Sequence, residues 1–120
     1  MKIKDIMNEN PITVSPNFSV GHTLNIFNNN KLRSLPVVNN DEIVGEVNFK
    51  DIYTKSLSRQ EKISNIMSEN PLTISPDEEL VNAVELLKKT NKFEIIVAKY
   101  NKFVGILSVE DIIKKLKAKK

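Results

Sequence analysis

The chain has 120 residues, of which 40% are hydrophobic and 28% charged, which is typical of a folded globular protein and excludes a disordered or fibrous chain. This length suffices for one compact domain or two small interdependent halves, so a conventional multidomain enzyme is not expected. The net charge is +3, and the absence of cysteine together with a single histidine argues against disulfides, thiolate chemistry and zinc. We expect no bound metal and no required cofactor.

The first half of the chain predicts alternating short helices and strands. A helical turn is expected at residues 3–7, and the Asn10-Pro11 pair then starts an extended segment at residues 12–14, because proline disfavours helix in the residue before it. Apolar residues at helical spacing predict a helix at residues 19–29. Strands are expected at residues 35–38 and 43–47, followed by an amphipathic helix at residues 49–57.

The second half predicts the same order of elements. Asp77 is expected to start a helix that carries Leu80, Ala83, Val84 and Leu87 on one face. Strands are expected at residues 95–98 and 103–107, and a last helix at residues 109–117. The predicted fold class is α/β, with two β-α-β-β-α repeats related by pseudo-twofold symmetry.

An internal repeat explains why the two halves look alike. The segment IMNENPITVSP at residues 6–16 returns as IMSENPLTISP at residues 66–76, and Gly45 and Asp51 return as Gly105 and Asp111 at the same offset of 60. We therefore predict two domains, 1–60 and 61–120, that together form one module in which each copy covers an apolar face of the other.

The C-terminal end is strongly basic. Five lysines lie there: Lys114, Lys115, Lys117, Lys119 and Lys120. Without them the remainder of the chain carries a net charge of −2. Such a tail can bind nucleic acid, but it also favours the negative end of a helix dipole and keeps a small protein soluble. Since no aromatic residues are interleaved with the lysines and no DNA-reading motif is present, we do not expect nucleic acid as the main partner.

Apolar stretches are short throughout the chain. None approaches the roughly 20 residues that cross a bilayer, and the N-terminus lacks the apolar core of a signal peptide. We therefore expect a cytoplasmic protein without membrane contact. An enzyme is not expected either, because no histidine–serine pair or carboxylate dyad is apparent and His22 lies on a predicted helix, where a structural role is common.

The segment GILSVED at residues 105–111, matched by GEVNFKD at residues 45–51, is the first candidate site. In one interpretation Ser108 caps the last helix and Asp111 is its third residue, with Asn48 and Asp51 as their equivalents. In the other, the helix start and the Ser108 hydroxyl hold a phosphate while Asp111 accepts hydrogen bonds from a ribose. Gly105 would let the ligand approach the backbone closely. Both interpretations can hold at once.

A second candidate combines Asn10-Pro11-Ile12-Thr13 with residues 32–36. Pro36, early in its strand, predicts an edge or irregular start whose free backbone groups can contact a flat heterocycle. A plain turn followed by a core strand is the alternative.

Taken together, the paired N-P-[IL]-T motifs, the SLPVV segment at residues 34–38 and the Gly-h-h-Ser-x-x-Asp segment (h, apolar) resemble the CBS domain family, with two repeats forming one Bateman module over essentially the whole chain. The resemblance implies a tandem α/β pair with two clefts between the repeats, in which adenosine-containing ligands such as AMP, ADP, ATP or S-adenosylmethionine bind. It also implies a homodimer that regulates an enzyme, transporter or channel. We expect no effector domain fused to the module, so the effector is expected to be another chain.

The resemblance also implies which residues line each cleft. Cleft A would comprise residues from the early part of copy one and the late part of copy two: Asn10, Ile12, Leu32, Arg33, Ile106, Ser108 and Asp111. Cleft B would comprise the converse set: Asn70, Leu72, Lys92, Phe93, Glu46, Asn48 and Asp51. Cleft B departs from the family pattern, because Glu46 would repel phosphate and Asn48 replaces the hydroxyl. We therefore expect cleft A to be the stronger site.

The predicted function is a regulatory module that senses an adenine nucleotide and relays its occupancy to a partner protein. In cleft A, Asp111 would accept hydrogen bonds from the ribose hydroxyls, and Ser108 and Arg33 would contact phosphate. The apolar residues Ile12, Leu32 and Ile106 would hold the base. A ligand-free dimerisation module and a nucleic-acid binder acting through the lysine tail are the alternatives.

Overall fold

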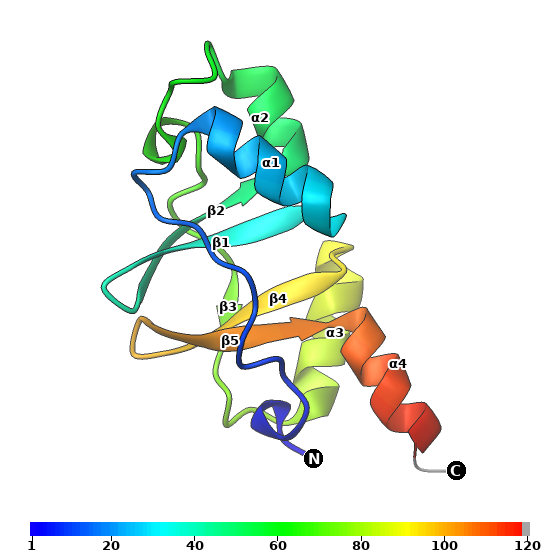
Figure 1. The fold of residues 1–120 in the computed structure, drawn as a ribbon. Helices are drawn as coiled ribbons and strands as arrows, with labels where there is room; N and C mark the ends of the chain where they lie inside the picture. The colour runs from blue at the N-terminus through cyan, green and yellow to red at the C-terminus, as the bar shows by residue number, and fades with distance from the viewer. Residues whose placement is uncertain (119–120) are drawn as a thin grey trace. The chain divides into compact units, whose positions relative to one another are not determined.

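A computed structural model describes residues 1–118, which form two compact units. Unit 1 consists of Met1–Pro11 together with the chain from Leu72 onward, and unit 2 consists of Ile12–Pro71. In Figure 1 the dark-blue N-terminal turn belongs with the yellow, orange and red elements of unit 1. The opening segment of each sequence repeat therefore lies in the unit that is built mainly from the other repeat.

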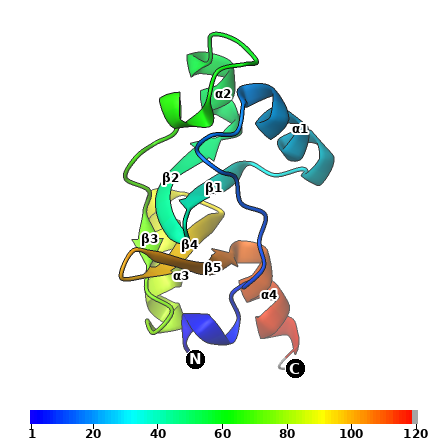
Figure 2. The ribbon, with the colours of Figure 1, turned by 60° about the vertical axis from the view of Figure 1, so that its left-hand side comes forward.

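Unit 2 is built around a hairpin. Its elements are α1 (Val20–Asn30), β1 (Ser34–Asn39), β2 (Glu42–Asn48), α2 (Phe49–Lys55) and the 3-10 helix η2 (Ile63–Asn65). β1 and β2 pair antiparallel, and a parallel bridge from Val14 to Val37 marks the predicted extended segment. Figures 1 and 2 show α1 and α2 side by side. The core of this unit includes Val20, Phe27 and Ile52, which come from one face of each helix.

Unit 1 repeats this arrangement around a three-stranded group. Its elements are the 3-10 helix η1 (Ile3–Asp5), β3 (Thr73–Ile74), α3 (Leu80–Thr90), β4 (Glu94–Lys99), β5 (Lys102–Ser108) and α4 (Val109–Ala118). β4 lies between β3, to which it is parallel, and β5, to which it is antiparallel. The structure thus confirms the α/β class and the two β-α-β-β-α patterns.

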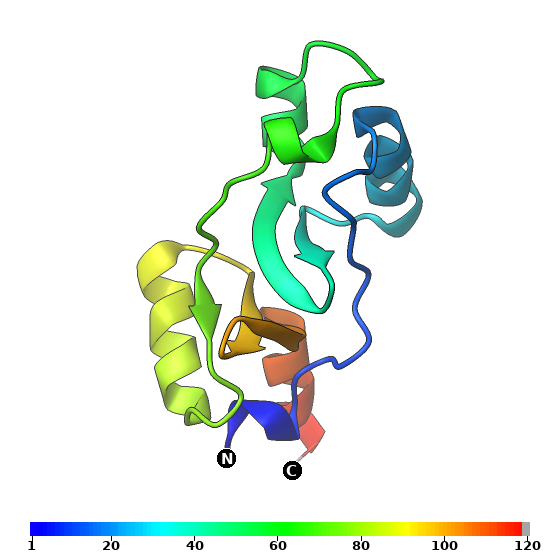
Figure 3. The same ribbon diagram turned by 90° about the vertical axis from the view of Figure 1, so that its left-hand side faces the viewer.

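The N-terminal segment is a structural part of unit 1. The Ile3 N–H donates to the Glu78 carbonyl at 3.0 Å, and the Leu80 N–H donates to the Met1 carbonyl at 2.8 Å. Ile3 is fully buried in a core that contains Ala83 and Leu87 of α3. Figure 3 shows this dark-blue turn beside one end of the yellow-green α3.

Both hairpins close with two residues in the left-handed region. Asn40 and Asp41 have φ of 51° and 66°, and Tyr100 and Asn101 have φ of 51° and 68°. Two consecutive positive φ values are the signature of the tight turn that matches the twist of paired strands. Asn and Asp adopt this conformation readily because their short polar side chains can hydrogen-bond locally, so three of the four residues suit it.

One predicted helix boundary is wrong. α3 begins at Leu80 with Glu79 as its N-cap residue, and the side chain of Glu79 makes no capping hydrogen bond. Asp77 lies before the helix, where its carboxylate forms ion pairs with Lys99 and Lys4. The Asp77 side chain therefore forms two tertiary ion pairs and does not cap the helix, although the local pattern predicts a cap.

His22 is exposed on α1, and its ring meets the Phe18 ring edge-on with a centroid distance of 4.6 Å.

Candidate functional site

Each unit contains one corner where a strand runs directly into a helix. We call residues 105–111 of unit 1 the late corner and residues 45–51 of unit 2 the early corner. The Ser108 hydroxyl oxygen accepts the Asp111 N–H at 3.1 Å, and Asn48 Oδ1 accepts the Asp51 N–H at 2.8 Å. The predicted helix caps are therefore confirmed in both corners. In each corner the carboxylate residue is the third residue of its helix, on the first turn.

A second segment pairs with each corner. In unit 1 the Asn8 N–H donates to the Ile106 carbonyl at 2.8 Å, and the Ile106 N–H donates to the Asn8 carbonyl at 3.0 Å. In unit 2 Ser68 and Glu46 exchange the equivalent pair of hydrogen bonds, at 2.8 and 3.0 Å. These bridges fix the segments that lead into the two N-P-[IL]-T motifs against the two corners.

The bridges also explain the glycine in each corner, and the explanation differs from the one we expected. A Cβ added to Gly105 would lie 2.5 Å from the Asn8 carbonyl oxygen. At Gly45 an added Cβ would lie 2.7 Å from the Met67 sulfur and 2.8 Å from the Ser68 carbonyl oxygen. The expectation that Gly105 admits a ligand to the backbone was wrong, because the chain itself occupies that space.

The predicted cleft residues are distributed over both units. Of the cleft A set, unit 1 contains Asn10, Ile106, Ser108 and Asp111, and unit 2 contains Ile12, Leu32 and Arg33. Of the cleft B set, unit 2 contains Glu46, Asn48, Asp51 and Asn70, and unit 1 contains Leu72, Lys92 and Phe93. The structure therefore places Asn10 in the same unit as the late corner and Asn70 in the same unit as the early corner. The two complete clefts stay predictions.

The two corner carboxylates differ in their ion pairs. Asp51 is 15% exposed and pairs with Lys55 one turn later on α2, at 3.5 Å. Within residues 1–118 no ion pair is formed by the Asp111 carboxylate, although Lys115 occupies the equivalent position on α4. Among residues 1–118, the late corner thus has a carboxylate that forms no ion pair, whereas the early-corner carboxylate pairs with Lys55.

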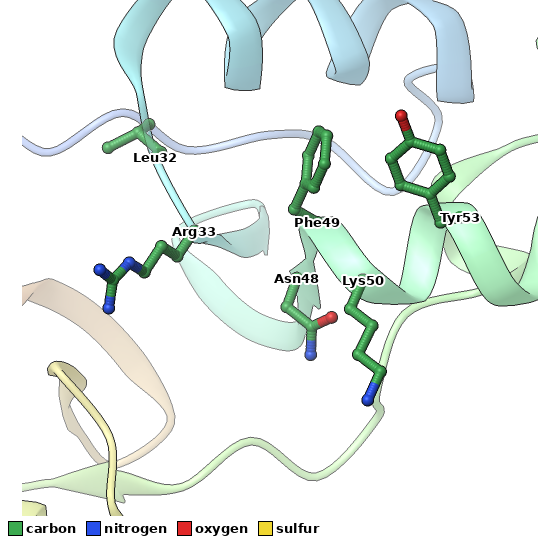
Figure 4. Close-up of a pocket in the computed structure, with 6 residues that line it drawn as sticks. All are labelled: Leu32, Arg33, Asn48, Phe49, Lys50 and Tyr53. Carbon is green, nitrogen blue, oxygen red and sulfur yellow. The ribbon is translucent and has the colours of Figure 1, made fainter.

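A pocket of about 560 Å³ opens on unit 2 (Figure 4). Its lining residues come from the start of β1 and the start of α2: Leu32, Arg33, Asn48, Phe49, Lys50 and Tyr53. The backbone places these two segments together, since the Phe49 N–H donates to the Arg33 carbonyl at 2.9 Å. We predicted Leu32 and Arg33 for cleft A and Asn48 for cleft B, so this pocket combines residues from the two predicted sets with three that we did not predict. The signal for them was their position around the early corner, next to Asn48 and one turn further along the helix.

Other kinds of site find no support in the part of the chain that the structure describes. Residues 1–118 hold no group of three or more His, Cys, Asp or Glu side chains able to bind a metal ion. No helix among them is long and apolar enough to cross a membrane. Of the basic tail, Lys114, Lys115 and Lys117 are exposed on α4, and Lys119 and Lys120 lie outside the described residues.

Comparison with known proteins identifies the family. The CBS domain model matches residues 3–58 and 63–118, so the chain belongs to the CBS domain family and contains two of its repeats. The uncharacterized protein MJ1232 of Methanocaldococcus jannaschii is 30% identical over 120 residues, which cover 99% of this chain and 40% of MJ1232. Inosine-5'-monophosphate dehydrogenase of the same organism is 29% identical over 119 residues, which cover 97% of this chain and 24% of the dehydrogenase. The chain thus spans less than half the length of these relatives.

Solved structures share the fold over nearly the whole chain. The CBS domain pair of protein MJ0100, solved in complex with 5'-methylthioadenosine and S-adenosyl-L-methionine, is 29% identical with a TM-score of 0.81, and the match covers 100% of this chain and 98% of that one. CBSX2 in complex with AMP is 24% identical with a TM-score of 0.86, covering 99% and 98%. The likeness to CBSX2 shows the fold.

Proposed function

We propose that this CBS pair is a regulatory module that binds an adenosine-containing ligand through its late corner. The observation that carries the proposal is the Asp111 carboxylate, which lies on the first turn of α4 and has no ion-pair partner within residues 1–118. A carboxylate in this position can accept hydrogen bonds from the two hydroxyls of a ribose. The MJ0100 pair, 29% identical to this chain, is solved with two adenosyl compounds, which supports the same ligand class here.

The other residues proposed for cleft A have complementary roles. Ser108 lies at the positive end of the α4 dipole, and its hydroxyl can donate to phosphate while its oxygen accepts the Asp111 N–H. Ile12, which is 40% exposed, and Leu32 offer apolar contact to a base, and Arg33 offers a cation to phosphate. Asn10, whose N–H donates to Asn8 Oδ1 at 3.0 Å, completes the set from the segment bridged to Ile106.

Cleft B is proposed as the weaker site. Its carboxylate, Asp51, is paired with Lys55, so a ribose would have to compete with a neighbouring ammonium group. The cap is Asn48 in place of a hydroxyl residue, and Glu46 adds a negative charge to the same corner. The charge of Glu46 repels a phosphate, which weakens binding of any anionic ligand there.

We further propose that the module acts on another chain. A ligand bound at the late corner would stabilise the conformation that binds it, and a partner that binds that conformation more tightly would sense occupancy. The proposal includes a homodimer, a cytoplasmic location and no catalytic role.

Isothermal titration with AMP, ADP, ATP and S-adenosylmethionine tests the proposed ligand class. We expect binding to the unchanged protein, a loss of about tenfold or more in Asp111→Ala, and a much smaller loss in the matched Asp51→Ala variant. Adenosine against 2'-deoxyadenosine compounds provides a second arm, because removing a ribose hydroxyl should weaken binding only while Asp111 is present. Absence of heat for all ligands, or equal binding by Asp111→Ala, would reject the proposal.

A ligand-free dimerisation module is the second candidate, and the exposed apolar side chains of α4 favour it. Ile113 is 45% exposed and Leu116 57% exposed, while Ile112 on the same helix is buried. If this function is the correct one, sedimentation will show a dimer that Ile113→Ser and Leu116→Ser weaken. No nucleotide would then raise the melting temperature, whereas a ligand at 100 times its Kd stabilises a protein by about 2.7 kcal/mol.

A further inference from the structure

The last helix of unit 1, α4, combines exposed apolar side chains with exposed lysines, and we propose that it binds the surface of an anionic lipid membrane. Ile113 is 45% exposed and Leu116 is 57% exposed. Lys114, Lys115 and Lys117 are exposed on the same helix, which Figure 1 draws in orange and red. This inference goes beyond the proposed function and does not depend on an adenosine ligand.

The exposed apolar pair lies on one face of α4. Ile113 and Leu116 are three residues apart, so their side chains are neighbours on the helix surface. Ile112, on an adjoining side of the helix, is 7% exposed and belongs to the core of unit 1. One side of α4 therefore holds the helix on its unit, while Ile113 and Leu116 expose apolar surface that would be more stable out of water.

The three lysines surround this pair. At about 3.6 residues per turn, Lys114 and Lys117 lie to one side of the pair and Lys115 lies to the other. Within residues 1–118 none of the three forms an ion pair. Ammonium groups on long flexible stems can reach lipid phosphates while the apolar side chains between them enter the headgroup region. The charge and the apolar pair of α4 thus complement the same surface.

The equivalent helix of unit 2 lacks the last turn of α4. α2 (Phe49–Lys55) stops three residues earlier in the repeat than α4 (Val109–Ala118). Ser56, the C-cap residue of α2, stands sixty residues before Leu116. Each helix buries one isoleucine at the same repeat position in the core of its unit. The extra turn of α4 is therefore not required by the shared fold, and surface binding gives it a function.

A membrane surface suits this helix better than a protein groove, a nucleic acid or a second copy of the chain. An amphipathic helix in a protein groove uses apolar anchors over several turns, but α4 exposes only Ile113 and Leu116, because Ile112 packs into its own unit. Nucleic-acid phosphates would contact the lysines and leave the apolar pair in water. Two α4 helices packed together would bring lysines of like charge close to one another.

The proposed contact is with the membrane surface only. No helix among residues 1–118 is long and apolar enough to cross a bilayer, and we expected no membrane contact for that reason. A helix that lies in the plane of the surface needs only a short amphipathic face. Such binding is weak and reversible, because each lysine adds a small electrostatic attraction to anionic lipid and the apolar pair adds a small transfer free energy.

Co-sedimentation of the full chain with lipid vesicles tests the inference. We expect binding to phosphatidylcholine vesicles that contain about 30% phosphatidylglycerol, no binding to phosphatidylcholine alone, and weaker binding as salt is added. Lys114→Gln and Lys117→Gln should each weaken binding about fivefold, and Leu116→Ser about tenfold. The matched controls on α3, Lys89→Gln and Val81→Ser, remove an exposed charge and an exposed apolar side chain and should change binding by less than about twofold.

A tryptophan reporter measures insertion directly. The chain has no tryptophan, so Leu116→Trp introduces a single indole ring. Its fluorescence should shift to shorter wavelength with the anionic vesicles, because the ring enters the interface and leaves water. Val81→Trp, at a position on α3 that is 60% exposed, should show no shift. A shift in both variants, or in neither, would overturn the inference.

Three further results would also overturn it. One is equal binding to the two kinds of vesicle, or undiminished binding by Leu116→Ser that its melting curve shows to be folded. Another is a single-stranded oligonucleotide that binds more tightly than the anionic vesicles at the same salt and equally well to Leu116→Ser, which would assign the lysines to nucleic acid. The third is a lipid-free dimer that Leu116→Ser dissociates, without vesicle binding, which would assign the apolar pair to a second copy.

Discussion

The Asn8 carbonyl oxygen lies where a side chain at position 105 would begin: it accepts the Ile106 N–H at 3.0 Å and would be 2.5 Å from a Cβ on Gly105. The N-terminal segment can thus bridge to the late corner only if residue 105 has no side chain. Ser68 and Gly45 repeat this relationship in unit 2. In each unit, the corner glycine permits two backbone segments to approach this closely.

Gly105→Ala should therefore destabilise the protein. Because the added methyl group meets a backbone oxygen that is itself hydrogen-bonded, we expect a loss of about 1–3 kcal/mol in the free energy of unfolding. Urea unfolding followed by circular dichroism measures it. Lys102→Ala, exposed on the same strand, is the matched control and should change stability by less than about 0.5 kcal/mol. Equal stability of Gly105→Ala and the unchanged protein would contradict the assigned backbone bridge.

Ile3→Ala should be strongly destabilising even though the residue is close to the chain end. Ile3 is fully buried against the α3 residues of unit 1, so truncation leaves a cavity and should cost about 2–5 kcal/mol. Ile113→Ala, which shortens a side chain that is 45% exposed, serves as the comparison and should have a much smaller effect. Thermal and urea unfolding of the two variants measure the loss of stability in each. If Ile3→Ala were as mild as Ile113→Ala, the N-terminal segment would not be a part of the unit 1 core.

The ion pairs of Asp77 predict a specific pH dependence. The hydrogen bond from Lys99, together with the positive charges of Lys99 and Lys4, holds the pKa of Asp77 below its ordinary value of 3.8. A lowered folded-state pKa gives stability that is present above 3.8 and is lost as the pH falls through the folded value. The hydrogen bond from Lys99 to Asp77 likewise raises the pKa of Lys99 above 10.5, so at the alkaline end its contribution is lost as the pH rises through the raised value.

Asp77→Asn should consequently lower stability slightly at pH 7, and the difference from the unchanged protein should shrink in strong acid. Both partners are exposed, so we also expect the difference to shrink with added salt. Urea unfolding between pH 2 and 8 at low and high salt measures both effects, with Asp41→Asn in an exposed hairpin turn as the control. A difference that neither pH nor salt alters would show that the charge of Asp77 is not involved.

Local patterns were sufficient to predict most of the secondary structure. The apolar spacing of residues 19–29 predicted α1, which covers Val20–Asn30, and the helix caps Ser108 and Asn48 lie where the local sequence placed them. These features depend on contacts between residues three or four apart, so the sequence contains the necessary information. Asp77 is the instructive failure, because its partners Lys99 and Lys4 lie far from it in the chain and outweigh its local capping preference.

The candidate site also combines residues that the local sequence predicted with residues that only tertiary contacts bring together. The sequence pointed to Ser108, Asp111 and Arg33, since their types and spacing follow the repeated motif. It missed Lys50 and Tyr53, which join Arg33 in one pocket only because β1 and β2 pair and bring the starts of β1 and α2 together. It also assigned the wrong reason to Gly105, whose neighbour in space is 97 residues away in the chain.

The sequence alone determined that this chain contains two copies of one α/β unit, with helices and strands in the same order, because repetition and apolar spacing are properties of neighbouring residues. The tertiary structure decided which segments make up each compact unit. Residues 1–11 join the chain from Leu72 onward because the Ile3 and Asn8 N–H groups find their hydrogen-bond acceptors at Glu78 and Ile106. Such pairings depend on chain closure over many residues, which no local pattern records.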